Sequence, residues 1–389
     1  MRFVRSWGRL DMKYKLSDIC EYAKGKIKVS VLDENTYIST ENMLPNKGGI
    51  AKAASLPTQE QTQAFMKNDV LVSNIRPYFK KIWYATFDGG CSNDVLVFRA
   101  KEGVSSRFLH YVLADDTFFD YSMATSKGTK MPRGDKKAIM EYEVPKLSYE
   151  EQCKIAGILE VIDEKIKLNT DINKNLFEQM QALYKAWFVD FEPFGGVRPS
   201  NWNDTNIYAI SNIIYGAPFA SKLFNTDGLG KPIIRIRDLK EQEFVTFTTE
   251  EHPKGHLIQP GDIVVGMDGE FRPYIWGNEP AWLNQRVCIF ENNRPQGKAF
   301  VLYTIRPLLN KIEQTQVATT VIHIGKKDFD AFEIALPDET TLDGFDSITA
   351  PMIEQIVSNR LQNKRLAVLR DTLLPKLMSG ELDVSDIDL

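Results

Sequence analysis

The chain has 389 residues, which is too long for one ordinary hydrophobic core and suits two domains with connections. Hydrophobic residues account for 43% and charged residues for 26%, and no run of about 18 apolar residues predicts a membrane-spanning helix, so we expect a globular protein with no membrane partner. The net charge of −4 argues against a uniformly basic nucleic-acid binder, so any contact with phosphate depends on local charge.

Residues 1–12 are expected to be an N-terminal extension. They lack the apolar stretch and the cleavage site of a signal peptide, and the four cysteines lie far apart without a CxxC pair. We therefore expect a cytoplasmic protein whose thiols are reduced.

Residues 13–147 are predicted to form a mixed α/β domain. Turn clusters such as Asp88-Gly89-Gly90 separate short β-rich runs, and a helix is expected at residues 107–113. The predicted strands are residues 37–39, 70–72, 82–86 and 95–98.

A long helix is the strongest local prediction, inside a spacer region at residues 148–195. No proline occurs from Ser148 to Glu192, and Ser148 and Glu151 have the spacing of a capping box. Apolar residues at intervals of three and four predict a coiled-coil-like seam. Its members are Ile155, Leu159, Ile162, Ile166, Ile172, Leu176, Met180, Leu183 and Trp187.

The second half follows the same plan. Residues 196–346 are predicted to form a second α/β domain, with strands at 233–236, 263–265 and 287–290 and a helix at about 300–316. A distal spacer region at 347–389 is predicted to hold a helix from about Pro351 to Ser379, kinked near Pro375.

Five segments of the first half recur in the same order in the second half at a nearly constant offset, which indicates an internal pseudo-twofold repeat. The matched pairs are 16–19 with 210–213, 67–72 with 260–265, 76–78 with 272–274, 144–145 with 336–337, and 173–176 with 363–366. Two copies of one unit suit a molecule that does one kind of task at two places.

Both long helices carry two asparagines at matching places. Asn169 and Asn173 recur as Asn359 and Asn363, each 190 residues later. A polar residue in a helical seam lowers stability and fixes register. The alternative is that all four are solvated surface positions, but their recurrence in both copies favours the register interpretation.

A loop after the predicted strand 70–72 carries residue types that can contact DNA. Arginine can read guanine, asparagine can read adenine and lysine can hold phosphate, although a solvated surface loop is an equal alternative. The candidates are Asn74, Arg76, Tyr78, Lys80 and Lys81. In the second copy Arg272 and Tyr274 repeat, and this shared Arg-Pro-Tyr core is also consistent with a structural role.

A basic loop at residues 127–137 is the second candidate. Its two glycines allow backbone N–H groups to approach phosphates, and Lys127, Lys130 and Arg133 would neutralise their charge, unless the loop is merely solvated. The counterpart at 319–327 supplies Thr320, His323 and Lys326 as DNA-contact candidates.

Catalytic motifs are absent from the sequence. It has no Asn/Asp-Pro-Pro-Tyr/Phe tetrad, no glycine-rich loop for S-adenosylmethionine and no GxxxxGK[ST] phosphate loop. Asp238-Leu239-Lys240 is too short to indicate a nuclease, and the pair His252 and His256 has no third metal ligand nearby. We therefore assign no catalytic and no metal-binding residue.

Two segments, at residues 151–191 and 374–381, resemble the specificity (S) subunit of type I restriction-modification enzymes. They contain Glu151-Gln152-Cys153-Lys154-Ile155-Ala156 and Leu374-Pro375-Lys376-Leu377-Met378-Ser379-Gly380-Glu381, and the resemblance extends over nearly the whole chain. It implies two α/β target recognition domains separated by two long antiparallel helices. Each domain would read one half of an interrupted site in double-stranded DNA.

The resemblance also implies a non-catalytic chain that recruits two methyltransferase subunits and, in the full complex, two restriction subunits. S-adenosylmethionine, ATP and magnesium would then be bound only by those partners. A helix of about 40 residues is about 60 Å long, which is enough to set two DNA-reading modules one duplex turn apart. Phe177, Trp187 and Phe188 are either partner contacts or core residues.

Two other functions stay open at this point. One is an orphan two-domain scaffold that binds protein, and the other is a methyltransferase or nuclease with its own recognition domains. The missing cofactor motifs argue against the enzyme.

Overall fold

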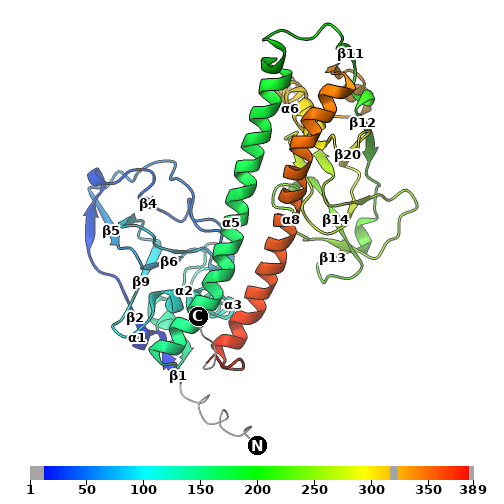
Figure 1. Ribbon diagram of the computed structural model, residues 1–389. Helices are drawn as coiled ribbons and strands as arrows, with labels where there is room; N and C mark the ends of the chain where they lie inside the picture. The colour runs from blue at the N-terminus through cyan, green and yellow to red at the C-terminus, as the bar shows by residue number, and fades with distance from the viewer. Residues whose placement is uncertain (1–12, 316–322, 385–389) are drawn as a thin grey trace, which may run out of the picture. The chain divides into compact units, whose positions relative to one another are not determined.

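The computed structural model describes residues 13–315 and 323–384, which form two compact units (Figure 1). Unit 1 comprises residues 1–164 and 367–389, and unit 2 comprises residues 165–366. Helices α5 (Tyr149–Phe188) and α8 (Glu339–Met378) are each 40 residues long, and each contributes one part to either unit. The mixed α/β class with two long helices is therefore confirmed, and no helix in the described ranges is long and apolar enough to cross a membrane.

Unit 1 is built on two sheets. The first has the strand order β2-β9-β6-β7, all antiparallel, and the second has the order β3-β5-β8-β4 with one parallel pair, β4 and β8. The strands are β1 (Lys13–Lys15), β2 (Cys20–Tyr22), β3 (Lys26–Lys28), β4 (Tyr37–Ile38), β5 (Gln61–Phe65), β6 (Val70–Ser73), β7 (Ile82–Tyr84), β8 (Gly89–Cys91), β9 (Val95–Ala100) and β10 (Glu143–Pro145), which pairs with β1. The helices are α1 (Leu16–Ile19), α2 (Ser106–Ala114), α3 (Asp116–Ala124) and α4 (Lys136–Ile139).

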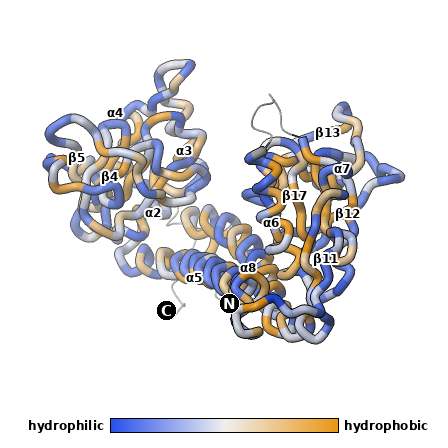
Figure 2. The backbone as a smooth tube through the Cα atoms, turned by 90° about the horizontal axis from the view of Figure 1, so that it is seen from above, coloured by the Kyte–Doolittle hydropathy of each residue, from blue (hydrophilic) through white to orange (hydrophobic). Residues whose placement is uncertain are grey.

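Strand β6 is buried on both faces, which explains its uninterrupted apolar run. Val70 and Val72 face a core shared with α2 and α3, whereas Leu71 faces the cluster that includes Phe65 of the second sheet. Figure 2 shows hydrophobic segments inside each unit and hydrophilic segments along its outer turns. The strands and the helix predicted for this half are confirmed.

Unit 2 repeats the topology of the first sheet of unit 1. Its first sheet has the order β12-β20-β17-β18, its second has the order β13-β15-β14-β19-β16 with β14 and β19 parallel, and β11 pairs with β21. The strands are β11 (Asn203–Asn206), β12 (Ser211–Tyr215), β13 (Phe224–Asn225), β14 (Lys231–Ile234), β15 (Phe247–Thr248), β16 (Leu257–Ile258), β17 (Ile263–Gly266), β18 (Pro273–Ile275), β19 (Ala281–Leu283), β20 (Val287–Asn292) and β21 (Glu333–Leu336). The helices are α6 (Lys298–Thr315) and α7 (Lys326–Asp330). The predicted repeat is thus a repeat of topology in the first sheet, whereas the second sheets share one parallel pair but differ in the number and order of their strands.

One matched segment is misaligned, however. In unit 1, Arg76-Pro77-Tyr78 precedes β7 and forms a short 3₁₀ turn (Pro77–Phe79). In unit 2, Pro273 and Tyr274 lie inside β18 and pair with β17. The two Arg-Pro-Tyr segments therefore occupy different places in the fold, and the predicted match between them is wrong.

Helix α8 begins earlier than predicted, at Glu339 instead of about Pro351. The Asp338 carboxylate accepts hydrogen bonds from the Thr341 amide at 3.1 Å and from its hydroxyl at 2.9 Å, and so caps the first turn. The helix then continues through Pro351 and Pro375 to Met378. Pro351 suggested a start because proline is common in the first turn of helices.

The apolar seam is confirmed at most of its predicted positions, with Ile166 and Ile172 as exceptions that are not buried and belong to no hydrophobic cluster of the described residues. In unit 1, Ile155 and Leu159 of α5 share a core with Leu374 of α8, and in unit 2 Met180 shares a core with Ile356. Ile172 is 37% exposed and does not belong to the seam. Phe177, Trp187 and Phe188 pack against the core of unit 2, so the core interpretation of these residues holds.

Asparagines occupy the seam where Ile172 was expected. Asn169 is 1% exposed and Asn173 is 7% exposed. Asn169 Nδ2 donates to Asn363 Oδ1 at 2.8 Å, and Asn359 Nδ2 donates to Asn173 Oδ1 at 2.9 Å. The two pairs are related by the sequence repeat, and they lock α5 against α8 within unit 2.

We predict that the Asn173–Asn359 pair is strongly coupled. Asn173→Leu should lower the free energy of unfolding by about 1–3 kcal/mol, because it leaves the buried Asn359 amide without its acceptor. The double variant with Asn359→Leu should regain much of that loss. A double-mutant cycle from denaturant unfolding measures the coupling. Asn175→Leu, at an exposed position of the same helix, is the control and should change stability by less than about 0.5 kcal/mol; additive effects of the two seam variants would contradict the prediction.

Unit 1 also contains a histidine that folding keeps neutral. His110 Nδ1 is buried without a hydrogen-bond partner among the described residues, and burial lowers the pKa of His110 to about 4, which the Asp163 carboxylate offsets only in part. The unfolded chain binds this proton near pH 6.5, so this histidine lowers stability progressively as the pH falls from about 6.5 to 4.

We therefore expect His110→Gln to lose less stability on acidification than the parent chain. The difference should grow to about 3 kcal/mol at most between pH 7 and pH 4, as measured by urea unfolding at several pH values. Parallel pH profiles for the two chains would show that His110 does not carry this effect.

Candidate nucleic-acid interface

The structure brings the two predicted DNA-contact loops of unit 1 together. The loop after β6 meets the loop before α4 in an isolated β-bridge between Ile75 and Arg133, and a second bridge, between Lys127 and Arg133, closes the loop before α4 on itself. The Arg76 amide donates to the Pro132 carbonyl at 2.8 Å, and the Lys127 amide donates to the Arg133 carbonyl at 2.9 Å. Two segments about 50 residues apart in the chain therefore form one surface.

A third segment, which sequence reasoning missed, joins this surface. The Asn46 amide donates to the Phe79 carbonyl at 2.8 Å, and the Lys47 amide donates to the Lys80 carbonyl at 2.9 Å. Asn46 and Lys47 both have positive φ, as their place in a Pro-Asn-Lys-Gly turn favours. That turn with its lysine was the available signal. We call residues 46–47, 76–81 and 127–133 together the basic surface.

The exposed carboxylate of Asp116 pairs with two lysines of the basic surface. Lys47 Nζ lies 2.9 Å from Asp116 Oδ1, and Lys80 Nζ lies 2.8 Å from Asp116 Oδ2. Burial alone would raise the pKa of Asp116, but hydrogen bonds from Lys80 and Lys47 outweigh burial and hold that pKa below its usual value. Asp116 therefore stays ionised and holds both lysines at the surface.

The remaining cations differ in how they are paired. Lys127 Nζ lies 2.6 Å from Asp135, and Arg133 lies 3.0 Å from Asp94. The hydrogen bond from Lys127, with those from the Ala138 and Lys137 amides, lowers the pKa of Asp135 to about 2. Within the described ranges, neither Arg76 nor Lys130 forms an ion pair, so both are available for an external anion.

Two of the predicted contact residues are less accessible. Asn74 is 8% exposed, and its side-chain oxygen packs so closely against Gly134 that a Cβ atom there would lie 2.9 Å from it. Lys81 donates to the Thr40 carbonyl at 2.6 Å, and burial lowers the pKa of its amine. In this conformation both side chains support the loop from within, and their contact with DNA stays a prediction.

Unit 2 has the same bridge with different side chains. The β-bridge here joins Asp268 and His323, and the Ile324 amide donates to the Met267 carbonyl at 2.9 Å. His323 Nδ1 lies 2.6 Å from Asp268, whose other carboxylate oxygen lies 3.5 Å from Arg286. Thus the described part of this surface carries paired charges. Thr320 lies outside the described residues.

The other candidates of unit 2 are engaged in internal contacts. Arg272 contacts Glu313 of α6 at 2.6 Å and Asn310 at 3.1 Å. Tyr274 packs against the core through β18, and Lys326 pairs with Asp330 at 2.9 Å along α7. These geometries show local structural contacts for all three, while a role in binding DNA remains a prediction.

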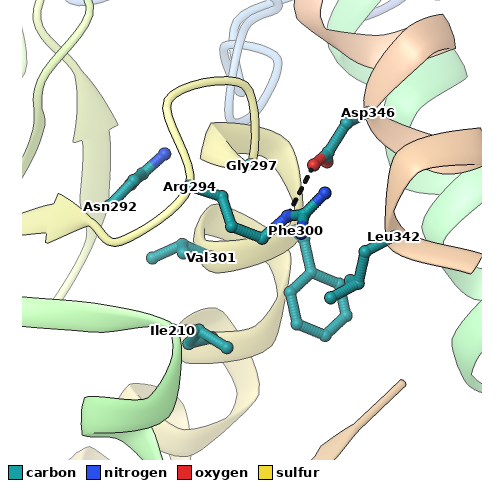
Figure 3. A pocket seen from close by; sticks show the side chains of 8 residues that line it. All are labelled: Ile210, Asn292, Arg294, Gly297, Phe300, Val301, Leu342 and Asp346. Atoms are coloured by element: carbon teal, nitrogen blue, oxygen red, sulfur yellow. Dashed lines mark hydrogen bonds and ion pairs between the residues drawn. The ribbon is translucent and has the colours of Figure 1, made fainter. Parts of the chain in front are cut away.

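Carboxylates elsewhere in unit 2 also serve the fold. Figure 3 shows Arg294 pointing at Asp346 beside a small pocket, and Glu339 and Asp343 pair with the same guanidinium. Asp238 accepts a hydrogen bond from the Arg235 amide at 3.0 Å, which explains the Asp-Leu-Lys segment as a turn. No cluster of three or more metal ligands occurs in the part of the chain that the structure describes.

Comparisons with known proteins agree on one family. The family described as "Type I restriction modification DNA specificity domain" matches residues 11–178 and 199–369. The MjaIX specificity subunit of Methanocaldococcus jannaschii is 27% identical over 74% of this chain and 71% of its own length. The HindI specificity subunit of Haemophilus influenzae is 24% identical over 95% and 99%. A crystal structure of a type I S subunit from M. genitalium shares the fold, with 16% identity, a TM-score of 0.55 and coverage of 94% and 96%.

Two arginines offer a matched test of these assignments. Arg272→Gln should lower the free energy of unfolding by about 0.5–1 kcal/mol, because it removes a partly exposed ion pair with Glu313, and it should leave the salt dependence of DNA binding unchanged. Arg76→Gln should leave the free energy of unfolding nearly unchanged and make the salt dependence of DNA binding less steep. Thermal unfolding and DNA titrations at several salt concentrations measure both, and a DNA-binding defect confined to Arg272→Gln would reverse the assignment.

Proposed function

Because this chain belongs to the type I restriction-modification DNA specificity family, and is a DNA sequence-specificity subunit, we propose that each of its units reads one half of a two-part site in double-stranded DNA. In unit 1 the basic surface would be the DNA-contacting face. The observation that supports this most directly is the joining of three cationic segments by backbone hydrogen bonds. The chain would act without chemistry of its own, in the cytoplasm.

Within the basic surface, some residues suit contact with phosphates and Arg76 suits contact with a base. Lys130 and Arg133 are exposed on a loop with Gly128 at positive φ, where backbone amides and side chains can approach phosphates. Arg76 has its guanidinium unpaired within the described ranges, so it can donate two hydrogen bonds to one guanine. Lys47 and Lys80 would exchange part of their contact with Asp116 for phosphate.

The two units would read different sequences. The first sheets of the two units have equivalent strand orders, yet the bridge carries Ile75 and Arg133 in unit 1 and Asp268 and His323 in unit 2. Different donors and acceptors at one backbone position favour different bases. The two 40-residue helices would set the number of unread base pairs between the half-sites.

The helices would also bind the partner subunits. We expect two methyltransferase subunits, and two restriction subunits in the full complex, to supply S-adenosylmethionine, ATP and magnesium. Leu168 and Ile172 of α5 are 53% and 37% exposed in unit 2 and lie one turn apart, so they offer an apolar contact for a partner helix. A protein-binding scaffold without DNA would leave the basic surface unexplained.

The function is tested by sequencing the methylated bases of cells that produce this chain with its cognate methyltransferase subunit. A new methylated motif of two short blocks with a fixed gap is the expected result. An assembled complex that adds no methylated motif would overturn the proposal, since the methyltransferase would then have no specificity supplied by this chain.

The basic surface makes a quantitative prediction. Replacing Lys130 and Arg133 by glutamine in the assembled complex should make the slope of log affinity against log salt less steep by about 2, because each phosphate that is no longer neutralised reduces the slope by about 0.9. Lys174→Gln, at an exposed position of α5, is the control and should leave the slope unchanged. An unchanged slope in the double variant would reject phosphate binding by this loop.

A further inference from the structure

The basic surface contains an aromatic tip, formed by Tyr78 and Phe79. Tyr78 is 48% exposed and Phe79 is 38% exposed, and their ring centroids lie 4.6 Å apart with planes inclined by 50°. Neither ring belongs to a hydrophobic cluster of the described core. Two adjacent rings that contribute nothing to the core are unusual at a polar surface and indicate a contact outside the chain.

The backbone holds this tip in a fixed orientation. Arg76 and Lys80, which flank the 3₁₀ turn, both have φ of 50°, a left-handed conformation that costs non-glycine residues about 1–2 kcal/mol. Hydrogen bonds from Asn46 to Phe79 and from Lys47 to Lys80 fasten the turn at its far side. Strained residues kept in place by their surroundings cluster at functional sites.

The neighbours of the tip favour DNA over an apolar protein partner. Lys81 Nζ lies 5.7 Å from the centroid of the Phe79 ring, and Lys80, which directly follows Phe79, adds a second cation. Arg133 is bridged to Ile75 beside it. An apolar patch surrounded by cations complements a duplex, which places bases between two rows of phosphates.

Unit 2 has no equivalent of this tip among its described residues. The connection between β6 and β7 spans residues 74–81, whereas that between β17 and β18 spans only 267–272. Phe271, the aromatic residue in the shorter connection, is fully buried. The aromatic tip is therefore an addition to a shared scaffold, as expected for an element that serves one half-site.

We propose that Tyr78 and Phe79 enter the major groove and contact the C5-methyl group of a thymine in the half-site read by unit 1. Among the groups that distinguish base pairs in the major groove, the thymine methyl is the one bulky apolar group, and the others are hydrogen-bond donors or acceptors. An apolar tip that reads an intact base pair therefore has thymine as its target. This inference rests on the proposed function, and it makes the tip a specificity element while the cations hold phosphates.

The test uses the complex assembled with the methyltransferase subunits and DNA duplexes that carry its methylated motif. Each thymine of the motif is replaced in turn by uracil, which removes only the methyl group. We expect about a four-fold loss of affinity at one position, close to the value for burying one methyl group. The Tyr78→Ala/Phe79→Ala variant should bind more weakly and show no loss at that position, whereas Tyr78→Phe, which keeps the ring, should retain the loss.

Salt titrations separate this inference from the proposed function. The alanine variant should keep the salt slope of the parent complex, because it removes no charge. Equal affinity of the parent complex for every uracil duplex would overturn the thymine contact, even if Lys130 and Arg133 variants still change the slope. Loss of methyltransferase subunits from the alanine variant, measured by native mass spectrometry, would instead identify the tip as a protein-docking site and also overturn it. If neither cation nor tip variants alter DNA binding, the proposed function of the basic surface fails.

Discussion

The candidate interface depends on one constraint, an isolated β-bridge. In each unit it joins the loop after a buried strand (β6 or β17) to the segment before a short helix (α4 or α7). In unit 1 it joins Ile75 to Arg133, and in unit 2 it joins Asp268 to His323. Strands β6 and β17, at whose ends these bridges lie, are buried on both faces. Backbone hydrogen bonds at the ends of these strands therefore position the loop side chains that differ between the two units. These bonds do not depend on the identity of those side chains.

This separation of backbone and side chain explains how two copies of one fold can differ in charge. Residues 70–72 of β6 and 263–265 of β17 are apolar, since a polar group there would lose its hydration without a partner, and the buried Ser73 at the end of β6 has such a partner in the Ile75 carbonyl. No such penalty applies to the loop positions. A cationic surface in unit 1 and a surface of paired charges in unit 2 are thus equally compatible with the same sheet, and specificity can change without cost to the core.

Much of the fold could be predicted from the sequence because it follows from local rules. The capping box at Ser148 is present, with the Ser148 amide 2.8 Å from the Glu151 carboxylate, and the apolar runs became strands of the expected repeat. Prediction failed where the answer depends on distant residues. The match of Arg76-Pro77-Tyr78 to Arg272-Pro273-Tyr274 ignored the longer β6–β7 connection, and Lys47 joins the basic surface only through contacts with Lys80 and Asp116. Ile172 fitted an ideal spacing, but the actual turn of the helix directs Asn169 and Asn173 inward.

The paired asparagines of the seam have a consequence for how such a chain can evolve. Each long helix carries both members of the pairing code, so Asn169 meets Asn363 and Asn173 meets Asn359 through equivalent bonds. The pairing is unchanged when the two helices are exchanged, and it depends on residues of the helices alone. Recombination that exchanges the domain in front of either helix leaves the matching asparagines intact. The helix pair can therefore join different recognition domains without a change in its own contacts.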